Sequence, residues 1–77
     1  MKENLEKFFN CDFHYVQVGL NREKDIRRRD EIYWNARQRA LGAIDVAQIG
    51  GLDYETAEMM YDEYCHRLEE ETYGKMC

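Results

Sequence analysis

Two cysteine–histidine groupings are the residues of this chain best suited to metal chemistry. Cys11 and His14 form a C-x-x-H pair, and Cys65 is followed directly by His66. Four such ligands could complete a tetrahedral zinc site. Adjacent residues of a helix point about 100° apart, however, so the second grouping is poorly shaped to hold one ion. The pattern therefore predicts neither a metal nor another cofactor, although it leaves zinc at these four residues open.

Catalytic chemistry has a weak basis in the other side chains. Glu63 and His66 have the spacing of ligands in di-metal helical bundles, but no second Glu-x-x-His pair accompanies them. Cys11 near His14 could form a thiol–imidazole pair, yet the sequence identifies no orienting group and no oxyanion donor for it. The chain contains no serine, and 77 residues leave little volume for a substrate pocket. We therefore expect a protein without enzymatic activity.

The charge of the chain is divided unevenly between its halves. The net charge is -5, yet residues 1–40 carry nine Lys or Arg against seven Asp or Glu, whereas residues 41–77 carry two against nine. Such asymmetry indicates either charge pairing within the fold or two different binding faces. No apolar run is long enough to span a membrane. The three cysteines and the lack of a signal peptide favour the cytoplasm.

The acidic second half predicts a face that binds another protein. If this part is helical, its first carboxylates form a surface with no Lys or Arg before Arg67, which would suit a basic cleft on a partner. Two consecutive aromatic residues cannot both face one core, so surplus aromatics could anchor that partner. The predicted binding residues are Glu55, Glu58, Asp62, Glu63, Glu69 and Glu70, with Tyr33 and Trp34 as aromatic anchors.

A basic cluster supports an alternative function. It comprises Arg22, Lys24, Arg27, Arg28 and Arg29, which could contact phosphates in a small dimeric nucleic-acid-binding regulator. The negative net charge and the lack of aromatic residues among these arginines weigh against that function. If residues 22–49 and 54–72 form a helical hairpin, Arg29 falls near residue 74. The cluster would then offset the carboxylates of residues 69–71 within the fold.

Two apolar stripes of helical period predict that hairpin. Small residues recur at spacings of 4, 3 and 4 before Gly50, and mostly bulky residues recur at 3, 4, 3 and 4 after Asp53. We expect helices over residues 22–49 and 54–72, capped by Asn21 and Asp53, with Gly50 and Gly51 ending the first. The stripes are Ala36, Ala40, Ala43 and Ala47, then Tyr54, Ala57, Tyr61, Tyr64 and Leu68.

The N-terminal segment, residues 4–18, permits two structures. The residues that fit one face of a helix are Leu5, Phe8, Phe9, Phe13, Val16 and Leu20. Gly19 resembles a helix stop. Residues 13–18 are rich in strand formers, however, so a short helix followed by a strand is the competitor. A lone strand would need a second copy of the chain or a partner to satisfy its backbone. We favour the helix and leave residues 11–18 open.

The junction between the two expected helices resembles a helix-turn-helix over about twenty residues. Ala47, Gly51, Leu52, Ala57 and Met60 have the offsets of that motif. In a DNA-reading protein the second helix enters the major groove, where phosphates line both sides. Here the second helix is acidic, so phosphates would repel it. We therefore expect a plain hairpin, whose acidic face could instead occupy a nucleic-acid site on another protein.

The sequence as a whole predicts one small, mainly α domain over residues 1–77. We expect an antiparallel helical hairpin with a packed N-terminal segment, and a homodimer rather than a monomer, because aromatic and Met side chains exceed what so small a core can hold. The favoured function is non-enzymatic protein binding. Size and charge suggest an inhibitor, anti-CRISPR-like, encoded by a phage or mobile element against a nucleic-acid-handling enzyme of host defence.

Overall fold

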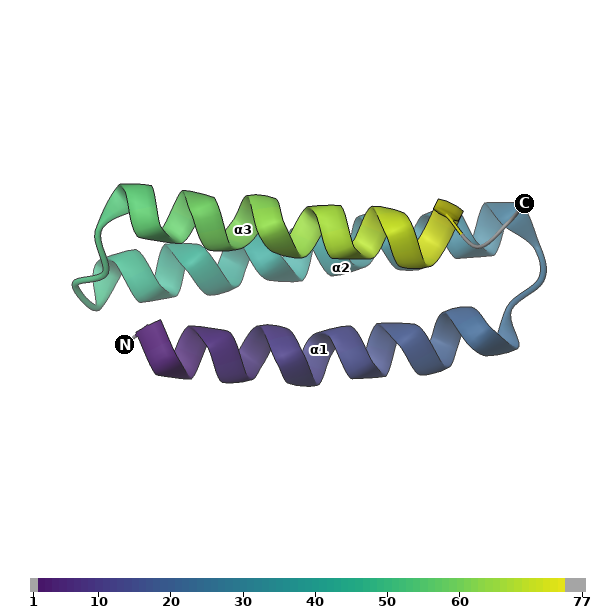
Figure 1. Cartoon of the computed structure of the whole chain (residues 1–77), viewed down its shortest axis with the longest axis horizontal. Coiled ribbons are helices and arrows are strands. Elements are labelled where there is room, and N and C mark those ends of the chain that lie inside the picture. The colour runs from purple at the N-terminus through teal and green to yellow at the C-terminus, as the bar shows by residue number, and fades with distance from the viewer. Residues whose placement is uncertain (1, 75–77) are drawn as a thin grey trace.

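The protein is a bundle of three helices. The computed structural model describes residues 2–74, in which α1 (Lys2–Arg22), α2 (Ile26–Ile49) and α3 (Tyr54–Glu69) are followed by a π-helical turn, η1 (Glu70–Gly74). The helices run side by side in a rod of 40 × 17 × 17 Å, with α2 in contact with both α1 and α3 (Figure 1). No strand occurs in residues 2–74. The all-helical prediction is confirmed, and the strand alternative for residues 13–18 is not supported.

α1 is longer than the sequence predicts. Leu5, Phe9, Val16 and Leu20 are buried along one face, which accounts for a helix through the strand-forming residues. The predicted stop at Gly19 is wrong because this residue stays helical, and a Cβ there would lie 3.8 Å from Ile32 Cδ1 of α2. Packing against α2 therefore extends α1 past its local stop signal.

The start of α2 also differs from the prediction. Asn21 lies inside α1, so it does not cap the next helix. Asp25 is the N-cap instead, and its carboxylate accepts a hydrogen bond from the Arg27 backbone N–H at 3.0 Å. The Glu23 carboxylate accepts from the backbone N–H groups of Lys24 and Asp25, at 3.1 Å each, and closes the turn. The predicted helix start near residue 22 therefore shifts to Ile26.

The turn between α2 and α3 follows the prediction. Gly51 has a φ of 114°, and the Leu52 N–H donates to the Ala47 carbonyl at 3.0 Å, as in a Schellman motif. Asp53 then caps α3, since its carboxylate accepts from the Thr56 N–H at 3.0 Å. The two helices that this turn connects, α2 and α3, lie antiparallel and side by side as a hairpin (Figure 1).

The core lies where α2 meets its two neighbours. Ala36 and Ala40 of α2 and Ala57 of α3 are fully buried, so the small-residue stripe packs within the chain. Large side chains fill the rest of the core, and the Phe9 and Tyr64 rings stack with centroids 4.6 Å apart. Tyr54, predicted as part of the α3 stripe, is exposed. Its position in the first turn of α3 places it beyond the end of this core.

Candidate functional site

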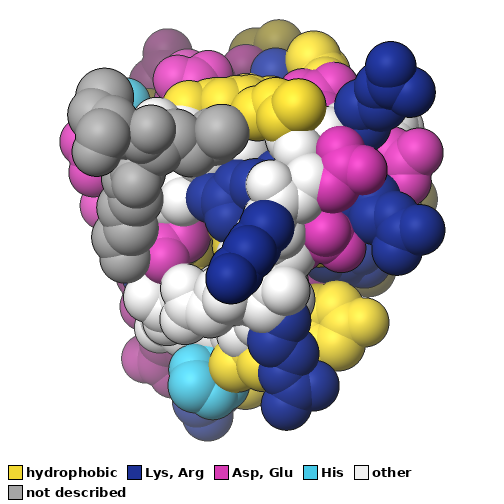
Figure 2. All heavy atoms as spheres, turned by 90° about the vertical axis from the view of Figure 1, so that its right-hand side faces the viewer, with side chains coloured by type: hydrophobic (Ala, Val, Ile, Leu, Met, Phe, Trp, Pro, Cys, Tyr) yellow, Lys and Arg dark blue, Asp and Glu magenta, His cyan; other side chains and the backbone are white. Residues whose placement is uncertain are grey.

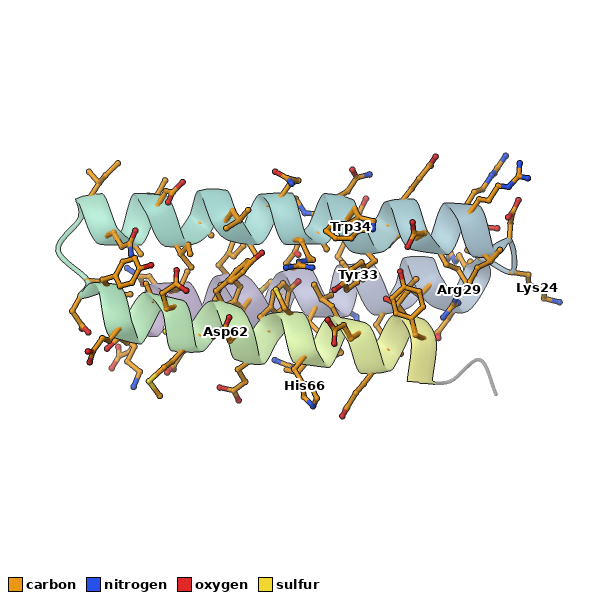
Figure 3. The ribbon with its side chains drawn as sticks, turned by 90° about the horizontal axis from the view of Figure 1, so that it is seen from above. Lys24, Arg29, Tyr33, Trp34, Asp62 and His66 are labelled. Carbon is orange, nitrogen blue, oxygen red and sulfur yellow. The ribbon has the colours of Figure 1, made fainter. Side chains whose placement is uncertain are left out.

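The outward side of α3, together with the start of η1, carries an acidic surface. We call it the acidic face: Glu55, Glu58, Asp62, Glu63, Glu69 and Glu70. It exists because Ala57, Tyr64 and Leu68 turn into the core and leave the intervening positions outside. Five of the six residues are exposed, and Glu58 is half-buried. Figure 3 shows two residues of this side, Asp62 and His66. Five of the six predicted carboxylates thus lie on α3, and Glu70 begins η1.

These carboxylates have few partners within the protein. Glu70 pairs with His66 Nε2 at 3.1 Å, and Glu69 accepts a hydrogen bond from the Tyr33 hydroxyl at 3.1 Å. Across residues 2–74, no Lys or Arg forms an ion pair with the acidic face. Met59 lies between Glu55 and Glu63, one helical turn from each, with 71% of its surface exposed. The surface therefore combines uncompensated negative charge with an exposed apolar side chain.

The two predicted aromatic anchors have different environments. Trp34 is 49% exposed, whereas Tyr33 is 3% exposed and belongs to the core. The prediction that both cannot face one core holds, but Tyr33 is not available as a surface anchor. Burial raises the pKa of Tyr33, and the hydrogen bond to Glu69 raises it further. Tyr33 therefore contacts the acidic face from the core, through its hydrogen bond to Glu69. Trp34 remains at the surface.

Arg37 joins Trp34 to α3, and sequence reasoning missed it. Its guanidinium lies 4.8 Å from the centre of the Trp34 ring, and its Nε donates to the Tyr61 hydroxyl at 3.4 Å. Its Nη1 donates to the Tyr33 hydroxyl at 3.2 Å. The separations of three and four residues from Trp34 and Tyr33 were the signal that could have identified it. Arg37 thus holds the exposed indole at the seam of α2 and α3.

The basic cluster is divided by the fold. Arg22, Lys24, Arg27 and Arg28 are exposed, and Figure 2 shows Lys and Arg side chains interspersed with Asp and Glu at this end of the bundle. Arg29 is half-buried and donates to main-chain carbonyls instead: Leu20 at 2.7 Å from the end of α1, and Thr72 at 2.8 Å from η1. The predicted register of the hairpin is thereby confirmed. Arg29 thus links the end of α1 to η1, and we call these hydrogen bonds the Arg29 clasp.

The four candidate zinc ligands do not converge. Cys11 is exposed on α1, Cys65 is buried in α3, and His66 points away from the core toward Glu70. In the part of the chain that the structure describes, no group of three or more His, Cys, Asp or Glu could hold a metal ion. Cys65 lies instead among the buried residues of α3, as a small core side chain.

Comparisons with known proteins supply no relative. The chain matches no protein-family model, and no curated protein or solved structure is significantly similar to it. None of the helices formed by residues 2–74 is long and apolar enough to cross a membrane.

Proposed function

We propose that this protein is a non-enzymatic binding module whose acidic face docks on the basic surface of a nucleic-acid-handling enzyme. One observation carries the proposal: six carboxylates lie on α3 and the start of η1, and no Lys or Arg of residues 2–74 forms an ion pair with them. Charge left uncompensated within a fold is available to a partner of opposite sign, where it speeds association and selects the partner.

The spacing of the acidic face suits a site built for nucleic acid. At about 1.5 Å per residue, the helical backbone rises about 22 Å between Glu55 and Glu70. The six carboxylates therefore average about one charge per 4 Å of the axis, at unequal intervals of about 1.5 to 9 Å. Phosphates follow one another at about 3.4 Å along one strand of DNA. A basic cleft that follows a phosphate backbone would therefore meet a similar charge density on α3. The mechanism is occlusion, in which the bundle occupies the cleft and excludes nucleic acid.

Apolar side chains beside the acidic face would hold the complex together. Met59 lies within the face, and Trp34 lies at the adjoining seam with its indole fixed by Arg37. Trp residues at protein interfaces often contribute a large share of the binding free energy. The small size and acidic charge of the chain lead us to propose a cytoplasmic nucleic-acid-handling enzyme of host defence as the partner, and a phage or mobile element as the source.

Direct nucleic-acid binding by the basic cluster has weaker support. Arg29 is committed to main-chain carbonyls, and the remaining cations share their end of the bundle with Glu23, Asp25 and Glu31. Carboxylates so close to the arginines would oppose phosphates at short range. The acidic face has no such mixture of signs, which is why we prefer it as the binding surface.

We also propose a homodimer through the apolar groove between α1 and α2. Phe8 of α1 and Ala43 and Val46 of α2 help to line this groove. Val46 is 70% exposed, and Ile49, about one turn further along α2, is 87% exposed. They adjoin Gly42, where an added Cβ would meet nothing within 4 Å. A two-fold axis would place the protruding side chains of one copy against the open space of the other. Val46→Glu with Ile49→Glu should then give a monomer in sedimentation, and Val18→Glu on α1 should not. Equal masses for all three proteins would refute this dimer.

A pull-down from a bacterial lysate tests the docking proposal. The bait is the tagged protein, compared with a variant in which Glu55, Glu58, Asp62 and Glu63 are changed to Lys, with and without nuclease. We expect the wild type to retain one nucleic-acid-binding protein after nuclease treatment and the variant to lose it. A control with Glu3, Glu31 and Asp45 changed to Lys should retain it. Retention by the acidic-face variant, or recovery of nucleic acid alone, would overturn the proposal.

A further inference from the structure

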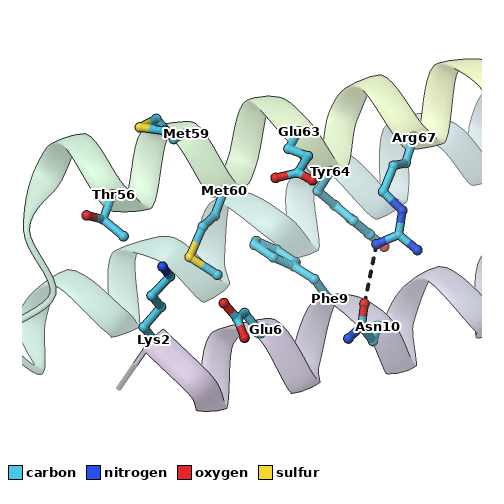
Figure 4. A pocket seen from close by; sticks show the side chains of 10 residues that line it. All are labelled: Lys2, Glu6, Phe9, Asn10, Thr56, Met59, Met60, Glu63, Tyr64 and Arg67. Carbon is cyan, nitrogen blue, oxygen red and sulfur yellow. Dashed lines mark hydrogen bonds between the residues drawn. The ribbon is translucent and has the colours of Figure 1, made fainter.

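A groove of about 420 Å³ lies between α1 and α3, on the side of the bundle that adjoins the acidic face. Figure 4 shows its walls, with Glu6 and Asn10 from α1 and Met60 and Glu63 from α3. Glu63 belongs both to this groove and to the acidic face. A partner that covers the acidic face would therefore also reach the groove.

The deep side of the groove is apolar and rigid. Phe9 and Tyr64 stack face to face, with an angle of 15° between their planes, and both residues are buried. The Tyr64 hydroxyl donates to Asp12 at 2.5 Å, which fixes the ring. Met60 is half-buried beside these rings and adds a polarisable thioether to the same wall. Such a lining accepts the aliphatic stem of a long side chain.

The rim of the groove carries two carboxylates on opposite helices. Glu6 and Glu63 are both directed toward the space between α1 and α3 (Figure 4). Neither forms an ion pair within residues 2–74. Arg67 also lines the groove, but its guanidinium lies 4.1 Å from the centre of the Phe13 ring and donates to Asn10 Oδ1 at 3.3 Å. Lys2 is the other cation at this rim.

We propose that this groove receives one arginine side chain of the basic partner. The inference rests on the proposed function and specifies its chemistry: the arginine stem lies on Met60 and the guanidinium bonds to Glu6 and Glu63. Arginine fits better than lysine, because its planar guanidinium has five donors, which can reach carboxylates on two walls, and it is more weakly hydrated. Lys2 competes for the same carboxylates.

Labelled nona-arginine and nona-lysine peptides are suitable probes, with affinity measured by fluorescence anisotropy at constant salt. Glu6→Gln removes a groove carboxylate that is not part of the acidic face. Glu3→Gln is its matched control, since Glu3 is also exposed on α1 but does not line the groove. We expect Glu6→Gln to weaken nona-arginine binding about five-fold and Glu3→Gln less than about two-fold. Lys2→Met should strengthen binding.

The outcomes separate this inference from the proposed function. A larger loss for Glu6→Gln than for Glu3→Gln, with nona-arginine more affected than nona-lysine, supports the groove. Equal losses for the two variants, or equal effects on the two peptides, overturn the groove but leave docking of the acidic face intact. A wild-type protein that binds neither peptide contradicts both. Methyl NMR provides a second readout, in which bound nona-arginine should shift the Met60 signal more in the wild type than in Glu6→Gln.

Discussion

The guanidinium of Arg29 donates to the main-chain carbonyl of Thr72 at 2.8 Å, so a residue from the first turn of α2 closes the C-terminal end of the bundle. Its other nitrogen donates to the carbonyls of Leu20 and Glu23, at 2.7 and 3.2 Å. One side chain thus donates to carbonyl groups at the end of α1 and in η1, where helix ends leave carbonyls short of donors. The Leu20 carbonyl also accepts from the Glu23 N–H at 3.2 Å. This clasp holds α3, and with it the acidic face, in register against α1 and α2.

Replacing Arg29 should therefore destabilise the fold. We expect Arg29→Met to lower the free energy of unfolding by about 2–3 kcal/mol, because its charge-assisted hydrogen bonds to the carbonyls of Leu20, Glu23 and Thr72 are lost. Arg28→Met is the matched control, since Arg28 is exposed, and should change stability by less than about 0.5 kcal/mol. Urea unfolding followed by circular dichroism measures both. Similar midpoints for the two variants would show that the clasp does not stabilise the bundle.

The two glycines of the α2–α3 turn should respond differently to alanine. Gly51 has a φ of 114°, which a residue with a Cβ adopts only with strain, whereas Gly50 has a φ of -77°. We expect Gly51→Ala to cost about 1 kcal/mol of stability and Gly50→Ala to be close to neutral. Thermal unfolding of both variants tests this, and a larger loss for Gly50→Ala would contradict the turn geometry.

The N-cap of α3 should become weaker in acid. Hydrogen bonds from the Thr56 backbone N–H and then its hydroxyl lower the pKa of Asp53 below its ordinary value of 3.8. Since the folded pKa is the lower one, the charged cap contributes its full stabilisation above pH 3.8 and loses it as the pH falls through the folded pKa. Asp53→Asn keeps a capping oxygen but does not titrate.

Melting temperatures of the wild type and Asp53→Asn between pH 2 and 5 provide the measurement. The melting temperatures of the two proteins should differ most near pH 5, and this difference should shrink as the pH approaches 2. A difference that stays constant over this range would mean that the charge of Asp53 does not support the cap.

Trp34 should contribute to partner binding more than to folding. About half of its surface is exposed, and Arg37 fixes the indole from one side. We expect Trp34→Ala to weaken binding of the captured partner at least about ten-fold, with little change in unfolding free energy. Tyr15→Ala is the control, because Tyr15 is an exposed aromatic on α1 with an arginine, Arg39, 5.7 Å from its ring centre. Isothermal titration calorimetry compares them, and an equal loss for both would remove Trp34 as an anchor.

The sequence correctly predicted those features of the fold that depend only on neighbouring residues, such as the α2–α3 turn and the cap of α3. Gly51 and Asp53 act through their own backbone angles and neighbouring N–H groups, and the sequence placed both correctly. Gly19 and Asn21 carried equally good local signals for a break, but the break lies at residues 23–25. There, packing of Gly19 near Ile32 and burial of Leu20 extend α1. These contacts join different helices, so the sequence of one segment alone does not predict them.

The candidate site divides in the same way. Helical spacing was sufficient to place five carboxylates of the acidic face on α3, but not to show that Glu70 begins η1. It also showed that Tyr33 and Trp34 could not share a core, but not which of them is buried. That choice depends on partners far along the chain, Glu69 and Tyr73, which contact the Tyr33 hydroxyl and ring. The groove between α1 and α3 was likewise beyond prediction, since its walls are about fifty residues apart in the sequence.

Competition with nucleic acid tests the central claim most directly. The affinity of the purified protein for its captured partner should be measured with and without a saturating single-stranded oligonucleotide, at one fixed salt concentration. If the acidic face occupies the nucleic-acid site, the apparent Kd will rise linearly with the oligonucleotide concentration divided by the oligonucleotide's own Kd, and the two ligands will never bind together. An unchanged Kd, or a ternary complex of partner, oligonucleotide and this protein, would contradict occlusion by the acidic face.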